Sequence, residues 1–254
     1  MFRFLELTLK MKISRFGSAV FFGLMLGLAS VVQAGNLVSN GDFTSYSGST
    51  IAAGEKAQLS SHVPTGWNIS SSVQYSYLDT PNSATSSQGG YAVYGPFANP
   101  AAPYTGNFIQ MDGDSRYGKA LSQQINGLTV GHQYTVTFQQ AAGQQSGFNG
   151  PTTEKWTVSF GSDTQDSSMY SLASHGIGAW ESQSMTFTAS SISEVLSFLA
   201  VGTPDGVPPT VFLADVNLAD TTPSPVPEPS SVATLLIGVA GVAGSYLRRR
   251  FKTA

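Results

Sequence analysis

The chain has 254 residues, a formal net charge of −3 and no cysteine, and only 11% of its residues are charged. Residues 35–222 carry four basic and 13 acidic side chains, a net charge of −9, so this central part is poorly suited to bind nucleic acid or anionic lipid. The lack of cysteine excludes disulfide bonds, and the fold must therefore rely on a hydrophobic core.

The first 34 residues have the pattern of a secretory signal peptide. Residues 11–15 are positively charged, residues 16–28 are apolar, and Val32-Gln33-Ala34 is a small-residue cleavage pattern. We expect export by the Sec pathway and cleavage after Ala34. Residues 1–10 look like an upstream extension, which makes Met11 a candidate for the true start.

Residues 35–222 are predicted to form a β-sandwich domain, because short stretches of alternating apolar and polar residues are separated by Gly, Asn, Pro and Ser. No helical periodicity is sustained there. The alternation favours two antiparallel sheets, as in a jelly roll or an immunoglobulin-like relative. The predicted strands cover residues 36–44, 73–78, 91–94, 107–112, 121–125, 133–139, 156–160, 185–188, 195–201 and 212–218.

The C-terminal part consists of three consecutive segments. Residues 223–229 are a proline-rich, extended linker, residues 232–247 are uncharged and largely apolar, and an arginine cluster follows. As a helix the apolar run would measure about 24 Å, slightly less than the ~30 Å hydrocarbon core of a bilayer. We therefore predict a marginal transmembrane helix within residues 230–254, with its arginine-rich end in the cytoplasm.

These three segments resemble the PEP-CTERM sorting signal of Gram-negative bacteria. The resemblance implies recognition by an exosortase, which is a membrane transpeptidase, during transit through the inner membrane. It also implies delivery to the cell surface or extracellular matrix of an exopolysaccharide-producing, biofilm-forming cell. The alternative is a permanent one-pass anchor. The motif residues are Val226, Pro227, Glu228, Pro229, Arg248, Arg249 and Arg250.

Short motifs along residues 36–218 resemble those of galactose-binding-domain-like jelly rolls, a group that contains many bacterial carbohydrate-binding modules. The resemblance implies a jelly-roll fold and a structural calcium ion between the first and last strands, with Asp42 and Asp215 as the available ligands. Thr44 and Val216 depart from the pattern of the group, and two surface aspartates at strand ends are the alternative. The motifs are residues 36–43, 66–67, 108–113, 121–128, 131–138 and 213–218.

Sugar binding needs aromatic faces beside amide and hydroxyl groups. Residues of these types in or near the predicted loops are Tyr91, Tyr94, Asn99, Tyr104, Asn107 and Trp180. The alternative is that the loop tyrosines only cap the sheets, while Trp67 and Trp156 belong to the core. The sequence Asp112-Gly113-Asp114-Ser115-Arg116 resembles the start of a calcium loop, but an ordinary acidic turn fits it better.

No catalytic motif occurs in the sequence. The histidines His62, His132 and His175 lie far apart, and neither a Gly-x-Ser-x-Gly nor a His-Glu-x-x-His pattern is present. We therefore predict a non-enzymatic surface or matrix protein that binds exopolysaccharide. The first alternative is a structural or adhesive biofilm protein without a sugar pocket, and the second is a secreted polysaccharide hydrolase.

Overall fold

The computed structural model describes residues 35–223. The predicted signal peptide, most of the linker and the predicted transmembrane helix lie outside these residues. Within the described part, no helix is long and apolar enough to cross a membrane.

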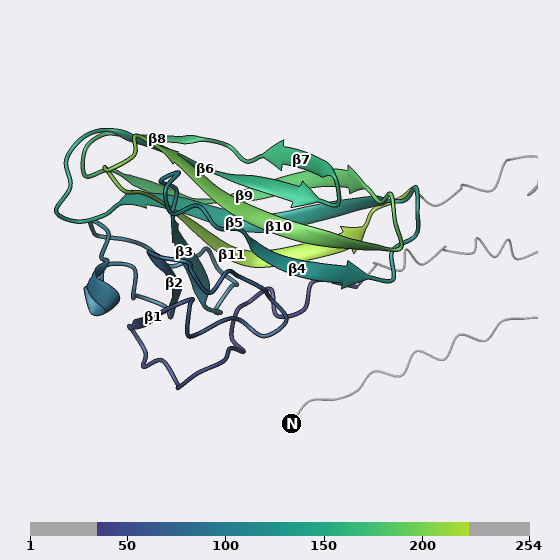
Figure 1. The fold of residues 1–254 in the computed structure, drawn as a ribbon, viewed down its shortest axis with the longest axis horizontal. Helices are drawn as coiled ribbons and strands as arrows, with labels where there is room; N and C mark the ends of the chain where they lie inside the picture. Colours follow the sequence, from purple (N-terminus) through teal and green to yellow (C-terminus); the bar gives the residue numbers. More distant parts are fainter. Residues whose placement is uncertain (1–34, 224–254) are drawn as a thin grey trace, which may run out of the picture. The chain divides into compact units, whose positions relative to one another are not determined.

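Two antiparallel sheets form the domain, as predicted (Figure 1). The six-stranded sheet has the order β1-β2-β3-β11-β5-β9, and the second sheet has the order β4-β10-β6-β7, with β8 paired to β6. The strands are β1 (Lys56–Gln58), β2 (Ser76–Asp79), β3 (Phe108–Asp112), β4 (Leu121–Asn126), β5 (Gln133–Gln144), β6 (Thr152–Phe160), β7 (Asp163–Asp166), β8 (Tyr170–Leu172), β9 (Ile177–Thr188), β10 (Ser193–Thr203) and β11 (Pro209–Asp220). One short 3-10 helix, η1 (Gln88–Gly90), interrupts the loop after β2.

Most of the predicted strands are confirmed, but two are wrong. Residues 36–44 form turns instead of a strand, because Asn40 and Phe43 have left-handed φ angles of 53° and 54° that interrupt an extended backbone. Residues 91–94 form only an isolated bridge, between Val93 and Gln145. The short strands β1, β7 and β8 were not predicted, because three or four residues are too few to show an alternating pattern.

The main core lies between the two sheets and is built from every second residue of the long strands. On β6 the buried side chains include Trp156 and Val158, and on β11 they include Val211 and Leu213. Trp67 is 4% exposed and Trp156 is fully buried, which confirms that both belong to the core. The alternation in the sequence therefore marks the inner faces of the sheets correctly.

A second cluster covers the outer face of the six-stranded sheet. Phe108 and Phe212 point away from the main core, and the segment 80–107 packs over them with Tyr91 and Val93. Because this segment brings its own apolar side chains, part of that outer face is buried as well. The segment begins at the end of β2 and leads into β3.

The domain starts and ends at the same end of the sandwich. The amide of Leu37 donates to the carbonyl of Leu218 at 2.8 Å, and the Asn36 side chain accepts from the amide of Leu218 at 3.0 Å. Residues 36–43 thus pair with the last strand through a few hydrogen bonds, although they do not form a regular strand. The first and last predicted motifs are therefore neighbours in space.

Candidate functional site

A pocket of about 330 Å³ lies where four loops meet, at the opposite end of β11 from residue 220. The loops precede β2, join β3 to β4, join β5 to β6, and join β10 to β11. We call it the loop-end pocket. It is lined by Tyr75, Asp112, Arg116, Tyr117, Gln145, Phe148, Gly206 and Pro208.

Three aromatic side chains of different loops line the loop-end pocket. The rings of Tyr75 and Tyr117 meet edge to face, with their centroids 4.6 Å apart. Tyr75 is 39% exposed and Phe148 is 37% exposed, so both rings are accessible to a ligand. Tyr75 also has a φ angle of 52°, an uncommon conformation for a residue other than glycine. Such exposed rings suit contacts with the C–H faces of a pyranose.

Asp112 adds a buried acid to the pocket lining. Its side chain is at the end of β3, and the residue is only 2% exposed. Oδ1 accepts a hydrogen bond from the amide of Asp114 at 2.9 Å, but Oδ2 has no partner among the described residues. Burial, together with the nearby Asp114 carboxylate, raises the pKa of Asp112 to about 7. An unpaired buried carboxyl oxygen is costly unless a ligand or water supplies a donor.

Asp114 and Arg116 form a closed ion pair beside Asp112. The guanidinium binds both carboxylate oxygens of Asp114, with Nε 2.8 Å from Oδ1 and Nη2 in contact with Oδ2. Oδ2 also accepts from the amide of Gly206 at 2.8 Å. These bonds hold the pKa of Asp114 well below its usual value. The segment 112–116 is therefore the acidic turn that the sequence favoured over a calcium loop.

Two of the predicted sugar-binding tyrosines lie behind the pocket instead of lining it. Tyr91 is fully buried, and its hydroxyl lies 2.7 Å from the hydroxyl of Thr210. Tyr94 donates from its hydroxyl to the carbonyl of Phe148 at 3.1 Å, so it supports the loop that presents Phe148. The sequence could not separate these roles, because both tyrosines fall in one short predicted strand, residues 91–94.

The other predicted sugar-binding residues also do not line the pocket. Trp180 packs edge to face on Phe108 and donates to the carbonyl of Ala98 at 2.8 Å, so it anchors the covering segment 80–107. Asn99 exchanges hydrogen bonds with Asn82 within that segment. Trp180 and Asn99 therefore make contacts that hold the covering segment in place.

In the structure, the two predicted calcium ligands, Asp42 and Asp215, both lie near Tyr104. The hydroxyl of Tyr104 donates to the backbone carbonyls of Asp42 and Asn107, the first at 2.9 Å. Asp215 lies at the bulge of β11 and accepts from Gln139 at 3.2 Å. Within residues 35–223, no group of three or more His, Cys, Asp or Glu side chains is arranged to hold a metal ion. Any ion would therefore depend on backbone carbonyls, and the calcium site stays a prediction.

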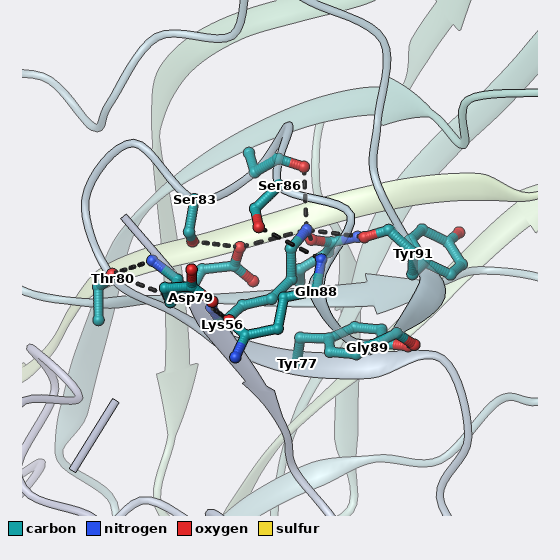
Figure 2. Close-up of polar contacts among 12 residues, drawn as sticks. Lys56, Tyr77, Asp79, Thr80, Ser83, Ser86, Gln88, Gly89 and Tyr91 are labelled. Atoms are coloured by element: carbon teal, nitrogen blue, oxygen red, sulfur yellow. Dashed lines mark hydrogen bonds and ion pairs between the residues drawn. The ribbon is translucent and has the colours of Figure 1, made fainter. Parts of the chain in front are cut away.

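A buried lysine fixes the covering segment to the sheet, which the sequence did not reveal. Lys56 is 1% exposed, and its Nζ donates to the carbonyls of Ala84 and Tyr91 at 2.9 and 2.8 Å. Nζ also donates to Gln110 at 2.8 Å and lies 3.6 Å from the buried carboxylate of Asp79 (Figure 2). Burial lowers the pKa of Lys56 and raises that of Asp79 to about 6. The ring of Tyr91, whose carbonyl is one of these acceptors, lies tilted against that of the pocket residue Tyr75, with the two centroids 5.9 Å apart.

Comparison with protein families identifies the C-terminal segment. Residues 225–250 match the PEP-CTERM protein-sorting motif. The chain carries this sorting motif. The match confirms the resemblance seen in the sequence, and the PEP-CTERM motif starts two residues after the described domain ends. Residues 100–207 match a family described as a protein of unknown function (DUF642).

Solved structures that match this chain include carbohydrate-binding modules. TmCBM61, in complex with beta-1,4-galactotriose, is 14% identical with a TM-score of 0.42, and the match covers 73% of this chain and 98% of that chain. The CBM22-1 xylan-binding domain of Paenibacillus barcinonensis Xyn10C is 11% identical with a TM-score of 0.33, over 69% of this chain and 100% of that chain. A structure described as CBM4 is 16% identical with a TM-score of 0.33, over 72% of this chain and 99% of that chain. A comparison with curated proteins gave no match.

Proposed function

We propose that this chain is an exported surface protein whose sandwich binds carbohydrate in the loop-end pocket without catalysis. The observation that carries the proposal is the pocket lining itself, in which three aromatic rings meet Asp112, a buried acid whose Oδ2 has no partner among the described residues. A sugar hydroxyl would supply the missing donor to Asp112, while the rings would contact the apolar faces of the sugar.

Non-catalytic binding accounts for the pocket better than hydrolysis does. A glycosidase needs two carboxyl groups that act on opposite sides of a glycosidic bond. In the loop-end pocket Asp112 is available, but the carboxylate of Asp114 is fully occupied by Arg116 and Gly206. The pocket lining therefore does not offer the second free carboxyl group that a hydrolase would need.

The PEP-CTERM motif supports export and exosortase-mediated sorting to the cell surface. We extend this to the predicted route: Sec-dependent export, transit as an inner-membrane precursor, and transfer to the surface or exopolysaccharide matrix of a Gram-negative biofilm. In that setting polysaccharide is the natural ligand of the pocket. Mass spectrometry of surface protein that still carries residues 232–254 would contradict processing of the tail.

Glycan-array binding of the purified full chain tests the pocket. We expect Tyr117→Ala to weaken binding by about tenfold, since an aromatic contact contributes roughly 0.5–1.5 kcal/mol beyond its buried area. Ile192→Ala is the matched control, because Ile192 is 68% exposed between β9 and β10, at the other end of the sandwich. If no arrayed glycan binds, the structural or adhesive alternative is favoured. Hydrolysis of an arrayed polysaccharide would instead support the alternative that the protein is a secreted hydrolase.

We also propose that a structural calcium ion joins residues near Asp42 to the bulge at Asp215. Support comes from the backbone carbonyls of Asp42 and Asn107, which face one hydroxyl of Tyr104 close to both acids. Calcium prefers such oxygen ligands. We expect millimolar calcium to raise the melting temperature and EDTA to reverse the rise, with Asp215→Asn abolishing the effect. An identical melting temperature with calcium and with EDTA would rule the site out.

A further inference from the structure

The charges in and around the loop-end pocket are unevenly paired. Arg116 is bound through two of its nitrogens to Asp114, whose side chain is fully buried. Asp205 accepts hydrogen bonds from the amide and hydroxyl of Ser115 at 3.0 and 2.7 Å. Among residues 35–223, Asp112 has no ion-pair partner. The pocket lining is thus left with one buried acid that has no bound cation beside it.

The aromatic rings around this acid favour the same kind of ligand group. A cation above an aromatic face is attracted by the ring quadrupole, and the attraction grows when the cation is removed from water. Tyr75, Tyr117 and Phe148 line the same pocket of about 330 Å³ as Asp112. Three rings and a buried carboxyl together form a site whose chemistry matches an ammonium group better than an uncharged hydroxyl.

We propose that the loop-end pocket selects sugars that carry a protonated amine, such as the 2-amino sugars of a partly deacetylated polysaccharide, over acetylated, neutral and acidic sugars. The inference rests on the proposed carbohydrate binding and names its ligand class. The ammonium group would donate to Oδ2 of Asp112 and contact the rings, while the remaining hydroxyls would face Gln145 and the loop backbone.

The alternative is that the pocket prefers an acidic sugar, because Arg116 also lines it and the Arg116 side chain is 54% exposed. Three observations count against it. The guanidinium is already neutralised by Asp114, its carbon lies 5.4 Å from the ring centroid of Tyr117, and residues 35–222 have a net charge of −9 that repels an anionic polymer.

Calorimetric titration of the full chain at about pH 7 with three matched oligosaccharides tests the inference. The probes are oligomers of β-1,4-glucosamine, of β-1,4-N-acetylglucosamine and of galacturonate. We expect the glucosamine oligomer to bind about tenfold more tightly than its acetylated counterpart, and the galacturonate oligomer to bind most weakly. Asp112→Asn should bring the first two affinities to within about threefold of each other.

Asp163→Asn is the matched control for the loss of one negative charge, because Asp163 is exposed at the start of β7. It should leave the preference for the amine unchanged. Should Asp112→Asn fail to fold, competition in the unaltered protein replaces it: methylammonium, which keeps the N–H donors, should displace the bound glucosamine oligomer from the pocket more effectively than methanol at the same concentration. Equal displacement by the two would contradict the amine preference.

The outcomes separate this inference from the proposed function. Equal or tighter binding of the acetylated oligomer would overturn the amine preference while carbohydrate binding stands. Tighter binding of the galacturonate oligomer would instead show that the pocket binds an acidic sugar, with Arg116 as its partner. Failure of all three oligomers and of every arrayed glycan would overturn carbohydrate binding itself, and the amine preference with it.

Discussion

At the residue scale, the described chain buries several polar groups without giving them partners. Asp112 is one, and it lines the loop-end pocket. Glu154 is another: it is fully buried on β6, on the face that also carries Trp156, and neither of its carboxyl oxygens has a partner within residues 35–223. Burial raises the pKa of Glu154 to about 8. Glu154 therefore stays protonated in the folded protein under conditions where it ionises in the unfolded chain.

This difference predicts how stability depends on pH. The unfolded chain ionises Glu154 near its ordinary pKa of about 4.3, so folding becomes less favourable as pH rises from about 4.3 and the loss levels off above about 8. Glu154→Gln cannot ionise. We expect the variant to be close to the unaltered protein at pH 4 and more stable by roughly 3–5 kcal/mol at pH 9, as measured by urea unfolding.

Asp163→Gln serves as the control for Glu154→Gln, because it places the same amide at an exposed position of β7. It should not change the difference in stability between pH 4 and pH 9. A Glu154→Gln variant whose stability falls with pH as steeply as that of the unaltered protein would contradict the assignment.

At the element scale, the segment 80–107 contains no strand beyond an isolated bridge at Val93, yet it covers part of the outer face of the six-stranded sheet. Lys56 on β1 holds it through two of its backbone carbonyls, and Trp180 on β9 holds it through the carbonyl of Ala98. Through Tyr91 and Tyr94 the segment supports two rings of the loop-end pocket. Its attachment should therefore influence binding as well as stability.

We expect Lys56→Met to loosen this segment. The substitution removes three hydrogen bonds and leaves the buried carboxyl of Asp79 without its cation, which typically costs about 3–5 kcal/mol. Hydrogen exchange should speed up first in residues 84–94, and binding at the pocket should weaken. The added change Asp79→Leu should recover part of the stability, because it removes the isolated acid.

Lys155→Met is the matched control for Lys56→Met. Lys155 is paired with Asp166 at the surface, where such a pair contributes at most about 1 kcal/mol. Equal losses of stability in the two variants would show that the burial of Lys56 has no special role.

At the scale of the whole molecule, the pocket and Asp220, the last residue of β11, lie at opposite ends of the sandwich. The strand β11 begins next to Pro208 of the pocket and ends at Asp220, shortly before the chain enters the PEP-CTERM motif (Figure 1). At about 3.3 Å per residue its 12 residues span roughly 40 Å. The pocket is therefore separated by about the length of one strand from residue 220, where the described domain leads into the C-terminal part of the chain.

This arrangement predicts that binding does not depend on the tail. A fragment of residues 35–223 contains both apolar clusters of the described domain. We expect it to unfold cooperatively and to bind the same glycans as the full chain with affinities that agree within about twofold. Both proteins should be measured in the same detergent, which serves as the control for the apolar tail. Loss of binding in the fragment would mean that residues 224–254 contribute to the site.

The sequence by itself determined the features that depend on neighbouring residues. Alternation of apolar and polar side chains located the long strands and the buried face of Trp156, and the resemblance of the Gly66-Trp67 motif predicted that Trp67 is buried. The order of Pro-Glu-Pro, apolar run and arginines identified the sorting motif. These signals are local, because a strand has a period of two residues and the tail motif is contiguous.

Only the tertiary structure decided where a ligand can bind. Tyr75, Asp112, Phe148 and Pro208 are far apart in the sequence and meet because strand pairing brings four loops to one end of the sandwich. The burial of Lys56 follows likewise from the fold, since the segment that covers it returns across the sheet about 30 residues later. Whether an aromatic or charged side chain binds a ligand, supports a loop or fills the core depends on these long-range contacts, and for that reason Tyr91 and Trp180 were indistinguishable from pocket residues in the sequence.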